Sequence, residues 1–313
     1  MKTKFALIFI VLLYAHGALA QNKPSVREID RIRLAEAFRL GESLGDRVWK
    51  DWNKAPFAVL LVTPEHEFLI RHPRASKDFT LVGYDPVLKS DVYFRKRQFG
   101  TNLLATFPAV GGISTIVIGQ AENTDKKTST PWVVTVLHEH FHQLQDSQPN
   151  SYAETEALNL SRGDQTGMWM LNYPFAYDSP EVRQQFSSLS RLLVEALQAK
   201  TRSDFSTRLA AYLAARQQLQ TMLSPDDYKY LSLQLWKEGL ARYTEYRVAR
   251  LAAAKFKPSK DFRALKDFTP FETVADNIIS VTMKELATLR LEESKRVAFY
   301  PLGAGEALLL DRA

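Results

Sequence analysis

The sequence predicts one α+β domain, because segments with strand character and segments with helical character occupy separate parts of the chain. Short apolar runs, broken by Pro, Gly, Asp and Lys, are confined to about residues 57–118. From Trp132 onward, apolar residues recur at helical spacing almost to the end. No Gly/Ser-rich linker and no internal repeat separates these parts, so we expect a small N-terminal sheet in one lobe and a mostly helical C-terminal lobe.

The first 20 residues have the layout of an export signal. Lys2 and Lys4 precede an apolar run from Phe5 to Tyr14, and Ala18-Leu19-Ala20 then gives the small-residue pattern of a cleavage site. The run is shorter than the about 18 residues that a membrane anchor requires. We therefore expect cleavage after Ala20, no stable membrane insertion afterwards, and an exported protein in the periplasm or the medium.

Composition limits the partners that are expected. The chain has no cysteine, which excludes thiolate zinc fingers and a fold that depends on disulfides. The formal net charge is +6, or +4 without the two lysines of the signal, and it is spread along the chain, so we expect no nucleic-acid partner. The densest basic group is Arg95-Lys96-Arg97, which we expect at an exposed sheet edge rather than in a binding patch.

The first lobe is expected over about residues 21–129. It begins with an amphipathic helix from roughly Val26 to Trp49. Runs rich in β-branched and aromatic residues follow and predict strands at Phe57–Val62, Glu67–Arg71, Val92–Arg95, Leu103–Phe107 and Thr115–Ile118. Gly111-Gly112 has two interpretations: a hairpin turn, or a place where a peptide strand lies along an edge strand.

The second lobe is expected over about residues 130–313. Thr130-Pro131 predicts an N-cap and a first helical residue, and Ser224-Pro225 predicts the same for a helix that continues through Tyr243. Thr269-Pro270-Phe271-Glu272 has the pattern of a capping box. A last helix is expected to begin at Gly303 with Leu308 to Leu310 as core.

The helix after Pro131 contains His138-Glu139-His140-Phe141-His142, which matches the pattern H-E-x-x-H. On a helix, His138 and His142 lie on the same face and can bind one metal ion, while Glu139 can reach a water on that metal and act as its general base. His140 points elsewhere, and we expect it in a surface or second-layer position. The alternative is that these histidines are ordinary solvated or hydrogen-bonded side chains.

A catalytic zinc site uses three protein ligands, so a third must lie downstream. No histidine follows His142, which leaves a carboxylate. Glu154 and Glu156 lie in a stretch rich in Ser, Asn and Gly, whereas Glu238 is in a helix beside Gly239, which permits close helix approach. The alternative for Glu238 is a salt-bridged surface stripe. Against this, Leu231 and Leu235 share its helical phase, which indicates that it faces inward.

The pair of motifs, H-E-x-x-H and the later W-x-E-G-L-A-x-Y around Glu238, resembles the gluzincin metallopeptidases of the thermolysin and aminopeptidase N type. The resemblance implies a zincin-like two-lobed fold with a small mixed sheet, and Glu238 as the third zinc ligand. Arg242 and Glu245 would support the ligands. Tyr300-Pro301-Leu302-Gly303 is similar to the Y-x-x-G turn of the aminopeptidase N group, which implies that Tyr300 stabilises an oxyanion; packing is the alternative role for Tyr300.

The spacing departs from that family, because Glu238 follows His142 by 96 residues, a much longer gap than in aminopeptidase N relatives. The resemblance therefore does not extend to exopeptidase specificity. We expect an exported zinc metallopeptidase with one Zn²⁺ ion and a peptide or protein substrate. The alternatives are a non-catalytic binding protein on a zincin scaffold and a zinc hydrolase that cleaves a non-peptide bond.

Overall fold

The computed structural model describes residues 23–313, so the predicted export signal over residues 1–20 lies outside the described part. Within residues 23–313 no helix combines the length and the apolar character that crossing a membrane requires. The predicted α+β class is confirmed, with a mixed sheet followed by a helical C-terminal region.

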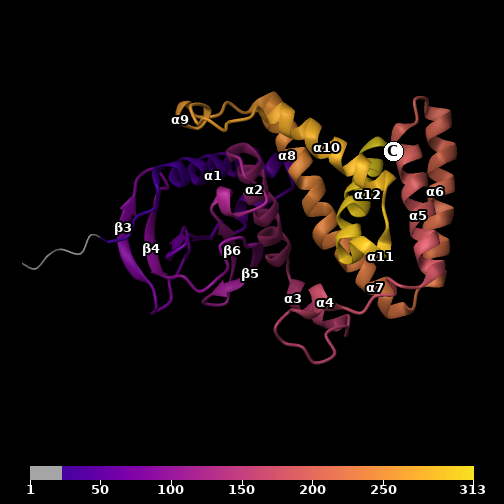
Figure 1. The fold of residues 1–313 in the computed structure, drawn as a ribbon, viewed down its shortest axis with the longest axis horizontal. Helices are drawn as coiled ribbons and strands as arrows, with labels where there is room; N and C mark the ends of the chain where they lie inside the picture. The colour runs from indigo at the N-terminus through magenta and orange to yellow at the C-terminus, as the bar shows by residue number, and fades with distance from the viewer. Residues whose placement is uncertain (1–22) are drawn as a thin grey trace, which may run out of the picture.

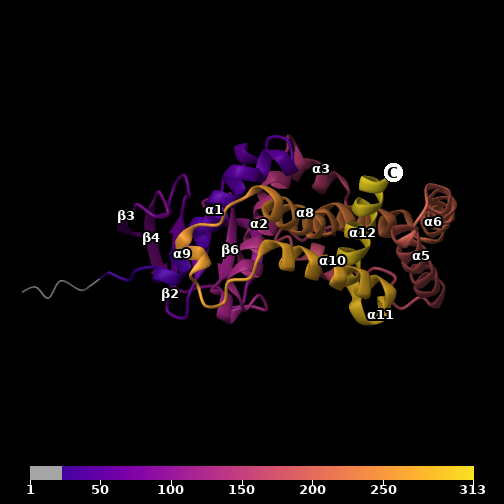
Figure 2. The same cartoon turned by 90° about the horizontal axis from the view of Figure 1, so that it is seen from above.

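The sheet and the outer helices lie at opposite ends of the molecule (Figure 1). Helices α1 (Glu28–Val48) and α2 (Ser129–Asp146) lie beside the sheet. Helices α5 (Pro180–Gln198) and α6 (Arg202–Met222) pack against each other at the far end. In the view from above, α8 (Leu240–Lys255) lies between the sheet and the outer helices (Figure 2). The centre of the molecule is therefore built by helices that contact both halves.

The sheet is six-stranded and mixed. In spatial order its strands are β3 (Thr80–Asp85), β4 (Ser90–Lys96), β2 (His66–Ile70), β1 (Val59–Val62), β6 (Ile113–Gly119) and β5 (Leu104–Val110). Neighbours are antiparallel except β1 and β6, which are parallel. Each of the predicted runs overlaps a strand, with ends that differ by a few residues. The sequence did not predict β3, because none of its residues is buried and a register shift between Leu81 and Gly83 breaks their alternation.

The central strand β1 is buried on both faces. Val59 and Leu61 join a large apolar cluster with residues of α1 and α2, while Leu60 and Val62 join a smaller cluster on the other face. This explains why the strand is a continuous apolar run instead of an alternating one. Gly111-Gly112 forms the hairpin turn between β5 and β6, with φ of 56° and 74°, values that glycine adopts without strain.

The prediction that Arg95-Lys96-Arg97 lies at an exposed edge of the sheet is wrong. These residues end β4, which lies between β3 and β2 and is not an edge strand. Arg95 is buried against the carboxylate of Glu67, with Nε 2.7 Å from Oε2, and Glu67 is fully buried. A buried carboxylate requires a cation, so Arg95 stabilises the sheet, while Lys96 and Arg97 are exposed.

The remaining elements of the helical half are α3 (Ser151–Ala157), α4 (Trp169–Asn172), α7 (Pro225–Gln234), a π-helical turn (Leu235–Gly239), α9 (Lys260–Arg263), α10 (Phe271–Ala287), α11 (Leu291–Ser294) and α12 (Phe299–Arg312). Helix α7, the π turn and α8 follow one another without a break. The predicted N-cap Ser224 is confirmed, because its side chain accepts a hydrogen bond from the Asp227 amide. Tyr230, toward one end of this continuous helix, belongs to an apolar cluster with residues of α5 and α6, the outer apolar cluster. Val248, toward the other end, belongs to the large cluster that contains Val59 and Leu61, the cluster under the sheet.

Two predicted helix starts are wrong. Helix α2 begins at Ser129 with Thr128 as its N-cap residue, and α10 begins at Phe271 with Pro270 as its N-cap residue; neither cap makes a side-chain hydrogen bond. The hydroxyl of Thr130 accepts instead from the Thr269 amide, 139 residues away. At the start of α2 the Ser129 amide donates to the distant carboxylate of Asp267 instead of to the local cap that the sequence suggested.

The predicted turn around Tyr300 is also wrong, because residues 299–312 form α12 and Tyr300 lies in its first turn. Of the predicted core residues at its end, Leu309 is buried but Leu310 is 77% exposed. Gly303 of α12 meets Gly239 of the π turn so closely that a Cβ built on Gly239 would lie 2.5 Å from the Gly303 Cα. The predicted close approach at Gly239 is confirmed, and its partner is α12.

Candidate metal centre

His138 and His142 lie one turn apart on α2, as the motif predicts, and both are buried. Their ring centroids are 5.0 Å apart. The helix is fixed on its other side by Val133, Val136 and Leu137, which are fully buried in the cluster under the sheet. The histidines therefore occupy the side of a rigid helix that faces the helical half.

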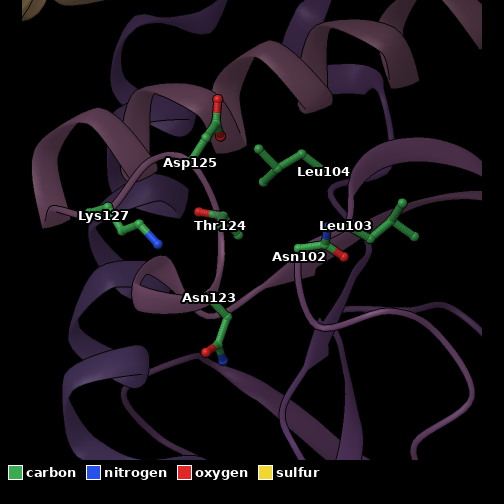
Figure 3. Close-up of a pocket in the computed structure, with 7 residues that line it drawn as sticks. All are labelled: Asn102, Leu103, Leu104, Asn123, Thr124, Asp125 and Lys127. Atoms are coloured by element: carbon green, nitrogen blue, oxygen red, sulfur yellow. The ribbon is translucent and has the colours of Figure 1, made fainter.

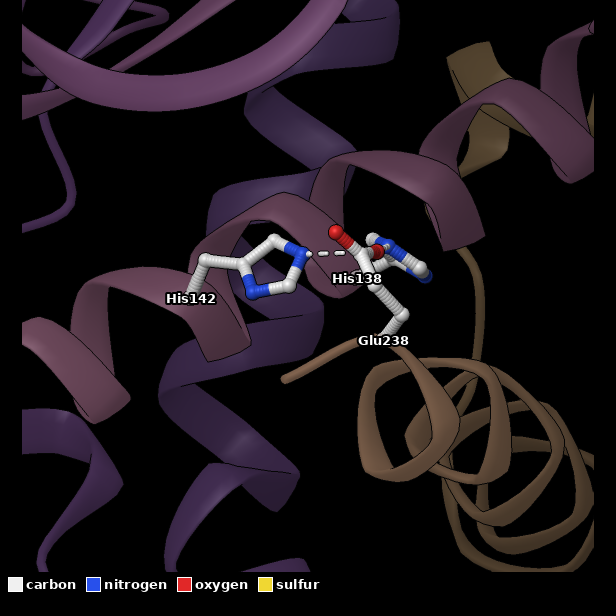
Figure 4. Close-up of side chains that lie close together, drawn as sticks. All are labelled: His138, His142 and Glu238. Atoms are coloured by element: carbon white, nitrogen blue, oxygen red, sulfur yellow. Dashed lines mark ion pairs between the residues drawn. The ribbon is translucent and has the colours of Figure 1, made fainter. Parts of the chain in front are cut away.

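Glu238 faces the two histidines from the π turn between α7 and α8 (Figure 4). Its Oε2 lies 3.9 Å from His138 Nε2 and 3.7 Å from His142 Nε2. One ligand atom from each of the three residues lies within 4.8 Å of the other two. Leu231 and Leu235 are buried, which confirms that this helical phase faces inward.

The donor set fits a zinc ion. Zn–N and Zn–O bonds of about 2.0–2.2 Å in a tetrahedral site place donors about 3.4 Å apart, somewhat closer than the 3.9 Å and 3.7 Å that separate Glu238 Oε2 from the Nε2 atoms of His138 and His142. Two imidazoles and one carboxylate are borderline ligands that suit Zn²⁺ and leave a fourth position open. The three ligand atoms, which lie within 4.8 Å of one another, would move closer together around a bound ion.

Glu238 lies in a π turn, and the next residue, Gly239, explains why this turn lies where it does. The contact of Gly239 with Gly303 lets α12 cross the turn at backbone distance. The Leu240 amide donates to the Leu235 carbonyl, five residues back, instead of four back as in an α-helix. Such single π turns inside α-helices occur frequently at functional sites.

His138 has a second partner on its other ring nitrogen. His138 Nδ1 lies 2.7 Å from Glu245 Oε1, but the direction in which the two groups approach does not meet the geometry of a hydrogen bond. Burial lowers the pKa of His138, but the carboxylates of Glu245, Glu139 and Glu238 outweigh this effect and raise it to about 9. Glu245 is therefore placed as predicted, beside a proposed ligand, whereas Arg242 pairs with Glu285 instead.

Glu139 points from α2 toward the edge strand β5. Its Oε2 lies 2.8 Å from the Thr106 hydroxyl, which also approaches the Glu139 backbone carbonyl at 3.0 Å. Glu139 is only 5% exposed, so the surrounding residues hold its side chain in a defined position. The hydrogen bond to β5 fixes the predicted general base next to the proposed ligand His138.

Tyr300 and Arg296 border the same carboxylate. Arg296 Nη1 donates to Tyr300 Oη at 3.1 Å and to Glu238 Oε1 at 3.3 Å. Burial, followed by the nearby Glu238 carboxylate, raises the pKa of Tyr300 well above its usual value. Because Arg296 donates to the phenol oxygen, the phenol keeps its own proton as a donor, with the Glu238 carboxylate beside it.

Other candidates lie away from these residues. His140 is buried instead of exposed, and its ring stacks on Phe57 with centroids 3.7 Å apart, so it belongs to the core. Glu154 and Glu156 lie exposed on α3 and join no ligand group. Sequence reasoning missed Thr106, Arg296 and Gln145. Only Gln145 had a local signal, its position one helical turn after His142.

Two cavities lie near the site without containing it. One, of about 590 Å³, opens at the start of β5 and is lined by Asn102, Leu103, Leu104, Asn123, Thr124, Asp125 and Lys127 (Figure 3). The other, of about 390 Å³, lies between α3 and α7, and its lining includes Trp236 and Gln148. Neither is lined by His138, Glu139, His142, Glu238 or Tyr300.

Comparison of the chain with protein-family models, curated proteins and solved structures gave no significant match.

Proposed function

We propose that the protein is a zinc-dependent peptidase, with His138, His142 and Glu238 as zinc ligands and Glu139 as general base. The convergence of these three ligand atoms, from helices far apart in the sequence, carries the proposal. Three buried or half-buried carboxylates, Glu139, Glu238 and Glu245, surround the two imidazoles. Such a concentration of negative charge is stabilised by a divalent cation.

A bound zinc ion supplies a Lewis acid that polarises the scissile carbonyl and lowers the pKa of water. Glu139 takes a proton from water, whose oxygen forms a bond to the carbonyl carbon, and transfers this proton to the amide nitrogen; the C–N bond then breaks and releases an amine and a carboxylic acid, which loses its remaining proton to solvent. Tyr300 donates its phenol proton in a hydrogen bond to the oxyanion. Thr106 keeps the Glu139 carboxylate in place during these steps.

The peptide bond as substrate, the gluzincin relationship and the zincin-like fold are supported by the resemblance of the two motifs, and export by the signal-like residues 1–20. The same apparatus hydrolyses other acyl bonds in principle, so the proposal commits to peptides on that resemblance. A scaffold that only binds peptides would retain the ligands without turnover.

The purified protein, with its zinc content measured, is incubated with a peptide mixture in the presence and absence of a chelator. We expect about one zinc ion per chain, cleavage that stops with chelator, and recovery on addition of zinc. Zinc without cleavage of any peptide would favour the binding-protein alternative, and cleavage of an ester or an acyl amide alone would favour the other hydrolase.

Tyr300→Phe is expected to lower kcat by about 100-fold with KM and zinc content unchanged, because phenylalanine keeps the ring and removes the oxyanion donor. Steady-state kinetics and elemental analysis measure the three quantities. A variant with wild-type kcat would assign Tyr300 to packing.

A further inference from the structure

Gln145 is a buried side chain that connects the two helices of the metal centre. It lies three residues after His142 on α2 and is 2% exposed. Its Oε1 lies 2.8 Å from His142 Nδ1. Its Nε2 donates to the Trp236 carbonyl oxygen at 2.7 Å, within the π turn that carries Glu238. A single amide group thus contacts the ring of one proposed ligand and the backbone of another ligand's turn.

The hydrogen bonds of Gln145 determine which nitrogen of His142 carries a proton. The Trp236 carbonyl only accepts, so the NH₂ group of Gln145 must face it and Oε1 must face the ring. Oε1 also only accepts, and His142 Nδ1 must therefore carry the hydrogen. In the neutral imidazole Nε2 then keeps its lone pair, and Nε2 is the nitrogen that faces Glu238 Oε2 at 3.7 Å. This is the tautomer that a metal ligand needs.

The second hydrogen bond of Gln145 acts on the π turn. In an α-helix the Leu240 amide would donate to the Trp236 carbonyl, but here it donates to Leu235. The Gln145 amide donates to the Trp236 carbonyl instead. A carbonyl that is partly shielded from water is unfavourable without a donor, so this part-buried hydrogen bond stabilises the π turn relative to a regular helix.

We infer that Gln145 is a positioning residue that sets zinc affinity by orienting His142 and the turn of Glu238 together. The inference rests on the proposed zinc site. Residues that hold metal ligands in place change metal affinity by about 10- to 100-fold when they are replaced. Here one side chain acts on two ligands, 96 residues apart in the chain.

The same helix offers a matched control. Gln143 is equally buried, its Oε1 lies 2.9 Å from His140 Nδ1, and its Nε2 donates to the carbonyls of Ala58 and Ser114. It makes the same kind of bridge, but to the sheet and to a histidine outside the ligand group. A change at Gln143 therefore reproduces the loss of a buried amide without touching the metal centre.

The experiment compares zinc dissociation constants of the wild type, Gln145→Met and Gln143→Met, measured by competition with a chromophoric chelator. Methionine keeps the length of glutamine and removes the amide. We expect zinc to bind about 10- to 100-fold more weakly to Gln145→Met and with nearly wild-type affinity to Gln143→Met, whose melting temperature falls. In Gln145→Glu, which keeps the acceptor for His142 and loses the donor to Trp236, affinity is expected between those of wild type and Gln145→Met.

Wild-type affinity in both Gln145 variants would overturn the inference and leave the proposed function intact. An equal loss in Gln143→Met would also overturn it, because general packing would then explain the effect. Absence of zinc binding by the wild type would overturn the proposed metal site, and this inference with it. If Gln145→Met does not fold, the comparison of Gln145→Glu with wild type decides.

Discussion

Replacing Glu139 by glutamine is expected to lower kcat/KM for peptide cleavage by about 100- to 10,000-fold while the zinc content stays at the wild-type level. Glutamine has the same shape and can still accept the hydrogen bond from Thr106, but its amide cannot take a proton from water. The proposed ligands His138, His142 and Glu238 are unchanged. Elemental analysis and steady-state kinetics on the same preparation measure both quantities.

Glu156→Gln, the same change at an exposed site on α3, is the control and is expected to behave as wild type. Unchanged turnover in Glu139→Gln would exclude this residue as general base. Loss of zinc from Glu139→Gln would instead indicate that Glu139 is itself a ligand.

Replacing Glu238 by alanine is expected to weaken zinc binding by more than about 100-fold, a larger effect than loss of a residue that only supports a ligand. The variant loses one of three donors and the charge nearest to both imidazoles. It also leaves Arg296 beside the site without its carboxylate partner, which adds repulsion toward a cation. Zinc per chain after dialysis and the dissociation constant provide the measurement.

Glu156→Ala is the control for this substitution as well, because Glu156 was a candidate ligand in the sequence and lies exposed in the structure. A full complement of zinc in Glu238→Ala would refute the ligand assignment. Zinc loss in Glu156→Ala as well would point to a general loss of structure.

Local rules were sufficient to predict the motif helix and its geometry. Two histidines four positions apart lie on one face of any α-helix, so their ring separation followed once the helix was predicted. Glu238 could be selected because the chain has no later histidine and because Gly239 indicated a close helix contact. That the three residues meet is a property of the fold that the motifs only suggested.

Other features depend on partners that sequence patterns do not contain. At the start of α2 the Ser129 amide donates to Asp267 Oδ2, 138 residues away, so its cap residues were misassigned. Tyr300 precedes a proline, which suggested a turn, but proline is also compatible with the first turn of a helix, where Pro301 lies. Thr106 is one hydroxyl on a strand, and nothing near it in the sequence indicates its contact with Glu139.

The continuous helix of α7, the π turn and α8 explains why the proposed ligands His142 and Glu238 lie so far apart in the sequence. The residues between His142 and Glu238 include α5 and α6, which pack in the outer apolar cluster at the far end of the molecule. The chain leaves the site after α2 and returns to it through α7. The long gap between the proposed ligands is therefore taken up largely by helices of the outer apolar cluster, which pack away from the three side chains.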